Sequence, residues 1–265
     1  MPKVSSQTRD FSLDAYRDLL SSIKQNDFEF YCFQDRPFLR QDINRHVILR
    51  HDVDRMPARA LKIAELEADE GIRSTFFFRT KSVSFNKRII HRILTMGHEI
   101  GYHYECLSDT RGDIDKAWQL FKQEIKKFED ICEIKSIAMH GRPLLPFDNR
   151  DLWDHFDYHD IGINIEVYKD VPWNKYVYFT DVSSRWDSEN NLRDHIPDKN
   201  SQIQGIRTTP ELIDFVETLD RNLIVSTHPE RWPSSKTGWV QARLMDLSAD
   251  YAKKFLKRIQ YLAHK

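Results

Sequence analysis

Seven short runs of apolar residues recur along the chain, each bounded by polar or turn-forming residues. They span residues 46–51, 74–79, 98–103, 136–140, 161–167, 176–180 and 223–227. Runs of this length that are apolar throughout are typical of strands buried on both faces of a parallel sheet. The pattern therefore predicts about seven parallel strands.

Amphipathic helical patterns lie between these runs. The clearest starts at Ile114, where apolar residues follow the spacing of one helix face as far as Phe128, and Asp113 is placed to cap it. Further helices are expected over residues 13–23, 58–70, 86–96, 210–219 and 248–263, the last with Tyr251, Phe255, Ile259 and Leu262 on one stripe. Strands that alternate with helices predict an α/β fold, either an open doubly wound sheet or a barrel, and the count of seven favours a distorted (β/α) barrel.

Polar and charged residues follow the carboxyl ends of the predicted strands. They are Asp52, Asp54, Arg79, His103, His140, Glu166, Asp181 and His228. In an α/β barrel these ends form a single face, where active sites are built. We therefore expect these residues, which are distant in sequence, to converge.

Asp52 and Asp54 stand one residue apart after the first strand. In such a pair, one carboxylate can bind a cation while the other acts as general base. The alternative is an Asx turn that caps the next helix.

His98 and His103 lie five residues apart on a predicted strand. At that spacing they are about 16 Å apart and on opposite faces of the strand, so they cannot bind one ion. We expect His98 to be structural and His103 to be a ligand.

Arg142 follows His140 in a His-Gly-Arg-Pro turn. A bidentate contact from Arg142 would orient a carboxylate such as Asp52. For His140 itself, the alternatives are a catalytic or ligand role and a satisfied buried histidine.

Two later segments pair an acid or a histidine with a tryptophan. His228 is the best candidate for a general acid, because imidazole titrates near neutral pH. Trp186 and Trp232 suit the apolar faces of sugars, although large aromatic side chains also plug the rims of cores. With Arg79 and Tyr104 they make up the predicted substrate-binding residues.

Together, these segments resemble the NodB-type polysaccharide deacetylases, the carbohydrate esterase 4 family. The resemblance covers about residues 47–232 and rests on Arg50-His51-Asp52-Val53-Asp54, Ser74-Thr75-Phe76-Phe77 and Gly97-His98-Glu99-Ile100-Gly101-Tyr102-His103. It implies a NodB-like barrel, a divalent metal on Asp54 and His103, Asp52 as base, and His228 as acid with support from Asp181. Zinc is the expected ion.

One position departs from the family pattern. The second metal histidine of the family falls on Leu107 here. His140 from the next strand is then the expected third ligand, and Glu105 is the alternative. The resemblance implies a hydrolase that removes an N-acetyl or other acyl group from a sugar or polysaccharide precursor. Two alternatives are a metal-free or weakened relative that binds glycans or scaffolds their assembly, and a hydrolase of a non-sugar amide.

Composition limits the partners and the compartment that we expect for this protein. Forty Lys and Arg residues against 41 Asp and Glu residues give a formal charge of −1, so the overall balance favours neither nucleic acid nor an anionic membrane surface as a partner. The three cysteines form no C-x-x-C pair, and neither a signal segment nor an apolar run long enough for a membrane span is visible. We expect one cytoplasmic domain over residues 1–265, with a core at about 46–232 and flanking helices at both ends.

Overall fold

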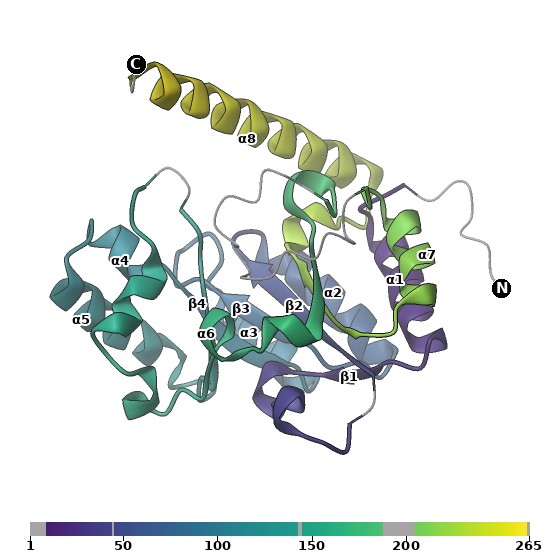
Figure 1. Cartoon of the computed structure of the whole chain (residues 1–265), viewed down its shortest axis with the longest axis horizontal. Helices are drawn as coiled ribbons and strands as arrows, with labels where there is room; N and C mark the ends of the chain where they lie inside the picture. Colours follow the sequence, from purple (N-terminus) through teal and green to yellow (C-terminus); the bar gives the residue numbers. More distant parts are fainter. Residues whose placement is uncertain (1–8, 44, 143–144, 188–204, 264–265) are drawn as a thin grey trace.

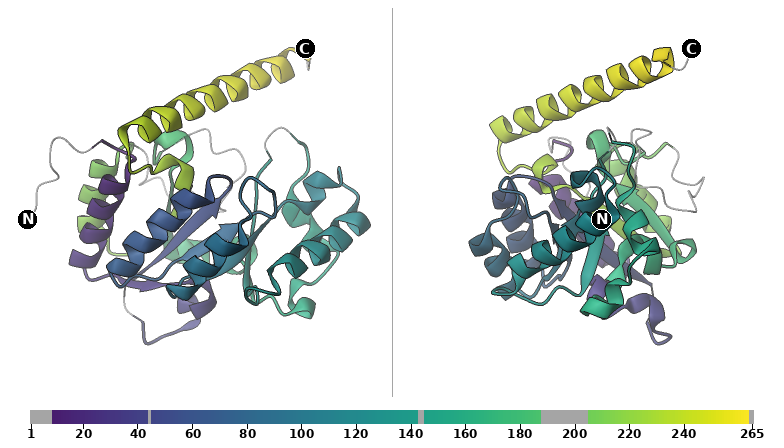
Figure 2. Two further views of the ribbon diagram at one scale, coloured as in Figure 1. Left: turned by 180° about the vertical axis from the view of Figure 1, so that it is seen from behind. Right: turned by 90° about the vertical axis from the view of Figure 1, so that its left-hand side faces the viewer.

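The computed structural model describes residues 9–43, 45–142, 145–187 and 205–263, with no side chains for residues 249–250 and 252–263. Within these residues eight parallel strands form one sheet, which Figures 1 and 2 show curled at the centre of the molecule. They are β1 (Glu29–Tyr31), β2 (His46–Val53), β3 (Thr75–Phe78), β4 (Glu99–Tyr104), β5 (Ser136–Met139), β6 (Ile165–Glu166), β7 (Tyr176–Thr180) and β8 (Asn222–Thr227).

The sheet order is β6–β5–β4–β3–β2–β8–β7. Strand β2 pairs with β1 through its first three residues and with β3 through its last four, while β8 covers its other edge. Among the described residues β6 and β7 pair with no further strand, so the barrel is incomplete. The predicted distorted, NodB-like (β/α) barrel of parallel strands is confirmed.

Helices lie around the curled sheet, except for the long C-terminal helix α8, which projects away from it (Figures 1 and 2). They are α1 (Leu13–Gln25), α2 (Pro57–Asp69), α3 (Lys87–Thr95), α4 (Cys106–Asp109), α5 (Ile114–Ile125), α6 (Val167–Asp170), α7 (Thr209–Thr218) and α8 (Lys236–Ala263). The Asp113 carboxylate accepts a hydrogen bond from the Lys116 amide at 3.0 Å, which confirms the predicted cap of α5. Helix α8 begins twelve residues before the predicted start at 248.

The three-residue strand β1 was not predicted, because three residues are too few to show a period of two. The seven predicted strands all occur, and every residue of β2, β3, β4, β5 and β7 is buried. This agrees with a sheet covered on both faces. No helix among the described residues combines the length and apolarity needed to cross a membrane.

A close approach inside the barrel positions two strands of the site. Phe77 of β3 pairs with Asp52 of β2 on one side and with Gly101 of β4 on the other. A Cβ at Gly101 would lie 2.4 Å from the Phe77 ring, so only glycine fits here. This packing sets β4, and with it His103, against the end of β2.

Candidate metal and acid–base site

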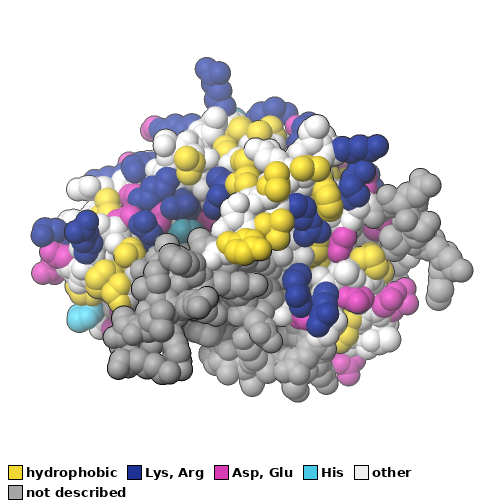
Figure 3. All heavy atoms as spheres, turned by 90° about the horizontal axis from the view of Figure 1, so that it is seen from above, with side chains coloured by type: hydrophobic (Ala, Val, Ile, Leu, Met, Phe, Trp, Pro, Cys, Tyr) yellow, Lys and Arg dark blue, Asp and Glu magenta, His cyan; other side chains and the backbone are white. Residues whose placement is uncertain are grey.

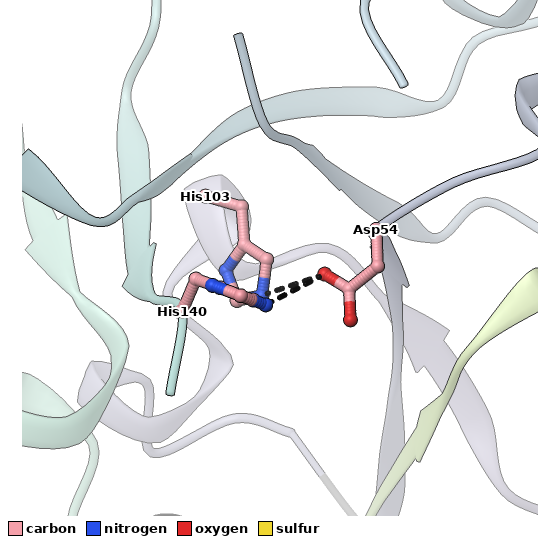
Figure 4. A group of neighbouring side chains, drawn as sticks. All are labelled: Asp54, His103 and His140. Carbon is pink, nitrogen blue, oxygen red and sulfur yellow. Dashed lines mark ion pairs between the residues drawn. The ribbon is translucent and has the colours of Figure 1, made fainter. Parts of the chain in front are cut away.

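Asp54, His103 and His140 meet at the carboxyl end of the sheet. The three side chains come from the ends of β2, β4 and β5 and point toward one another (Figure 4). Asp54 Oδ1 lies 3.4 Å from His140 Nε2 and 3.6 Å from His103 Nε2. One ligand atom from each residue lies within 4.8 Å of the others. A carboxylate and two imidazoles at this spacing match the ligands of a divalent transition metal.

The second nitrogen of each imidazole is already engaged. His103 Nδ1 lies 2.9 Å from the Ala138 carbonyl oxygen, and His140 Nδ1 lies 3.1 Å from Glu105 Oε2. Both acceptors place the proton on Nδ1 and leave Nε2 to bind a metal. Glu105, the alternative third ligand, therefore orients His140 instead of joining the three inward-facing atoms.

Two further observations fit a cation here. Asp54 Oδ1 is buried and has no hydrogen-bond partner in the part of the chain that the structure describes, which is costly unless a ligand satisfies it. Burial lowers the pKa of His103 to about 4, so its ring is neutral at physiological pH, the form that binds metals. Burial also lowers the pKa of His140, but Asp54 and Glu105 outweigh it and raise that pKa to about 9, so a metal would displace a proton from this ring. The alternative, in which Asp54 caps the next helix, is wrong, because α2 begins after Met56 and has no side-chain cap.

Leu107 does not face this cluster as a ligand. It lies in α4 and packs in the hydrophobic core. Histidine would occupy this position in the resembled family, whereas in this chain His140 supplies the second imidazole from β5. The structure thus brings two histidines and one aspartate together, although Leu107 stands where the resembled family has its second metal histidine.

Asp52 is held by Arg50. Both oxygens of Asp52 accept from the Arg50 guanidinium, each at 2.8 Å, and both side chains are buried. Burial alone would raise the pKa of Asp52, but the nearby charges of Arg50 and His228 outweigh it and lower the pKa. Asp52 is therefore an ionised carboxylate, with Oδ2 3.7 Å from His103 Nε2.

The predicted contact between Arg142 and Asp52 is wrong. Arg142 Nη1 donates to Asp109 Oδ1 at 2.8 Å and lies 3.7 Å from Glu105. Arg50 occupies the orienting position because residues two apart on a strand point to the same face. That spacing was visible in the sequence. Pro143, the next residue of the turn, lies outside the described residues.

Asp181 fixes His228 at the carboxyl end of β8. Asp181 Oδ1 lies 2.7 Å from His228 Nδ1, and Oδ2 accepts from the His228 amide at 2.9 Å. Burial and Arg231 lower the pKa of His228, but Asp181 outweighs them and raises it to about 9. The imidazole is protonated at neutral pH, as a general acid requires. The predicted pairing of His228 with Asp181 is present.

Three predicted substrate contacts are wrong. Trp186 and Trp232 are buried and pack against each other, with ring centroids 5.8 Å apart. The Trp232 indole donates to Asp181 Oδ2 at 2.7 Å, so this tryptophan helps to hold the carboxylate that binds His228. Tyr104 is buried and donates to Glu166 at 3.0 Å. The tryptophans therefore plug the rim of the core.

The remaining predicted residues have structural partners. Arg79 holds Glu105 Oε1 through two nitrogens, at 2.8 and 2.6 Å, and so supports the carboxylate behind His140. Nothing in its geometry tests the predicted substrate contact. His98 accepts from the Ser74 amide at 3.2 Å, away from the cluster, as expected for a structural histidine.

Glu230 was missed by the sequence analysis. It is buried two residues after His228, and its Oε2 has no hydrogen-bond partner among the described residues. Burial and the nearby Asp54 charge raise its pKa. The sequence pointed to Glu230 only through its position two residues after the candidate acid His228.

A comparison with solved structures finds similarity to carbohydrate esterases of family 4. A Streptococcus mutans CE4 esterase matches with 15% identity over 87% of this chain and 90% of its own, at a TM-score of 0.46. A family 4 carbohydrate esterase from Bacillus anthracis matches with 15% identity over 96% and 91%, at a TM-score of 0.40.

A CE4 family pseudoenzyme from Bacillus anthracis matches with 15% identity and a TM-score of 0.43; the match covers 78% of this chain and 64% of the pseudoenzyme. No protein-family model and no curated protein sequence matches. At these identities and TM-scores, no activity transfers from these proteins to this chain.

Proposed function

We propose that this protein is a metal-dependent hydrolase that removes an N-acetyl or other acyl group from a sugar or polysaccharide precursor. The observation that carries the proposal is one cluster, Asp54, His103 and His140, that has an ionised carboxylate, Asp52, 3.7 Å from His103 and a protonated imidazole, His228, whose charge acts on Asp52 and Asp54. Hydrolysis of an amide needs both a base for water and an acid for the departing amine.

Asp54, His103 and His140 would hold a divalent ion, with zinc the expected one. A bound ion supplies Lewis-acid stabilisation of the negative charge that develops on the acyl oxygen. The two imidazoles meet this role because their Nδ1 protons are already engaged by Ala138 and Glu105.

The protein's own residues divide the proton transfers. Asp52 removes a proton from the attacking water, and Arg50 fixes the carboxylate in place through two hydrogen bonds. His228 donates its proton to the nitrogen of the departing amine. Asp181 holds that imidazole through Nδ1 and thereby leaves Nε2 to face the substrate. The products are a free amine and a carboxylate.

The alternative of a glycan-binding protein loses support from the burial of Trp186 and Trp232, on which its binding surface depended. A hydrolase of a non-sugar amide would use the same acid and base.

The test incubates the zinc-loaded protein with N-acetylated amino-sugar oligomers and with nucleotide-linked N-acetyl sugars. Hydrolysis is measured as the release of acetate. Wild type is expected to release acetate, and Asp52→Asn is expected to lose activity while still binding zinc. Full activity in Asp52→Asn would contradict the assigned base. Activity confined to non-sugar amides would contradict the proposed sugar substrate but not the proposed roles of the site residues.

A further inference from the structure

The apolar residues of α8 lie on an exposed side of the helix. Val240, Leu244, Leu247 and Tyr251 recur at i, i+4, i+7 and i+11 and are 51–74% exposed. We call these four residues the α8 stripe. A surface helix normally turns its apolar face toward the core, so α8 has the opposite orientation.

Specific contacts hold α8 through its other side. Ala242 is buried, and the Trp239 indole donates to the Asp10 carbonyl at 2.8 Å. Asp246 accepts from Arg231 Nε at 3.1 Å and from the Ser184 hydroxyl. Residues 239, 242 and 246 follow the i, i+3, i+7 spacing of one helix face. The outward position of the stripe is therefore fixed by the packing of the helix.

The stripe lies near the candidate site. Val240 and Leu244 line an open groove of about 710 Å³ together with Arg55, which directly follows Asp54 in the sequence. In Figure 3, which views this end of the molecule from above, hydrophobic side chains gather beside Lys and Arg side chains. A surface that contacted the stripe would thus lie beside the site.

Charge distinguishes between the possible partners of the stripe. The chain as a whole has a formal charge of −1, but residues 251–265 contain five Lys or Arg residues and no Asp or Glu. Two parallel copies of α8 would place like charges together, which is unfavourable. An anionic lipid surface complements the same charges, and each Lys or Arg near such a surface strengthens binding. The side chains of Phe255, Ile259 and Leu262, which the sequence analysis placed on one stripe with Tyr251, lie outside the described residues.

We propose that α8 docks the protein on an anionic lipid surface, with the α8 stripe buried at the boundary between headgroups and acyl chains. An apolar stripe on a long helix with Lys- and Arg-rich polar positions is the usual form of a helix that lies in the membrane interface. Docking of this kind needs no membrane span and does not depend on the proposed hydrolysis.

The experiment is co-sedimentation of the full chain with vesicles of phosphatidylcholine alone or with one quarter phosphatidylglycerol. Wild type is expected to bind the phosphatidylglycerol vesicles, more weakly as salt is raised. Leu244→Ser with Leu247→Ser should weaken binding at least tenfold. The matched control is Leu39→Ser with Val83→Ser, which removes two apolar side chains of similar exposure outside α8 and should bind as wild type does.

Equal binding by the stripe variant, or no binding of wild type to anionic vesicles, would overturn the proposal. So would a wild-type dimer in light scattering that the stripe variant converts to a monomer, because a second copy would then cover the stripe. Zinc content and circular dichroism of the stripe variant should match wild type, which separates this test from that of the proposed hydrolase.

Discussion

Arg50 and Asp52 form a fully buried ion pair between neighbours on one face of β2. Removing one partner of such a pair leaves an uncompensated buried charge, which costs about 3–5 kcal/mol. Arg50→Met should therefore lower the free energy of unfolding by that amount, and Arg50→Met with Asp52→Asn should lower it by less. Urea unfolding followed by circular dichroism measures both. A double variant less stable than Arg50→Met would contradict the buried pairing.

His228 provides a pH prediction. Its pKa of about 9 lies above the ordinary histidine value of about 6.5, so the protonated form is present at pH 7–8 and is lost as pH rises through about 9. If His228 is the acid, kcat should fall above about pH 9. Asp181→Asn removes the interaction that raises the pKa, so the alkaline fall should move to lower pH. An unchanged profile in that variant would exclude His228 as the titrating acid.

The residue scale also shows what the sequence could and could not predict. Asp54, His103 and His140 were predictable because each lies at the carboxyl end of a strand or directly after it, and the ends of parallel strands share one face. Arg142 was misplaced because it lies in a turn whose direction no periodicity determines, and there it binds Asp109. The tryptophans were misplaced because a loop position does not reveal whether an aromatic ring turns inward.

At the scale of elements, β3 and β4 depend on the fit of Phe77 against Gly101. Gly101→Ala should lower the free energy of unfolding by about 1–3 kcal/mol, the usual cost of overpacking a core. Thermal or urea unfolding measures the loss. Phe77→Leu in the Gly101→Ala background should recover part of it, because it removes ring atoms next to the added methyl group. No loss in Gly101→Ala would show that the two strands can separate at this point.

Element boundaries explain the unusual third ligand. Helix α4 begins at Cys106, immediately after β4, and places Leu107 in the core. The next strand, β5, ends at Met139, so His140 emerges beside His103. Strand order was enough to nominate His140, whereas the role of Glu105 as its hydrogen-bond partner required the bend after β4.

At the scale of the molecule, the alternation of buried strands and amphipathic helices predicted the barrel, because burial on both faces leaves a clear apolar signal. The outward stripe of α8 was not predictable, since amphipathicity alone assigns the apolar face to the core.

Metal binding should also stabilise the whole fold. An ion that binds only the folded chain at about 100 times its Kd adds about 2.7 kcal/mol, or about 5–10 °C in Tm for a chain of this size. Differential scanning calorimetry should show that rise with zinc and its loss with chelator. His103→Ala should show no rise, and an equal rise in that variant would place the ion elsewhere.

The most direct measurement is zinc content per chain by elemental analysis after dialysis against limiting zinc. The candidate site predicts about one ion in wild type and in His159→Ala, a half-exposed histidine outside the site, and its loss in His140→Ala and His103→Ala. One ion retained in His140→Ala would contradict the assignment of His140 as the third ligand. No ion in wild type would contradict the metal-dependent hydrolase itself.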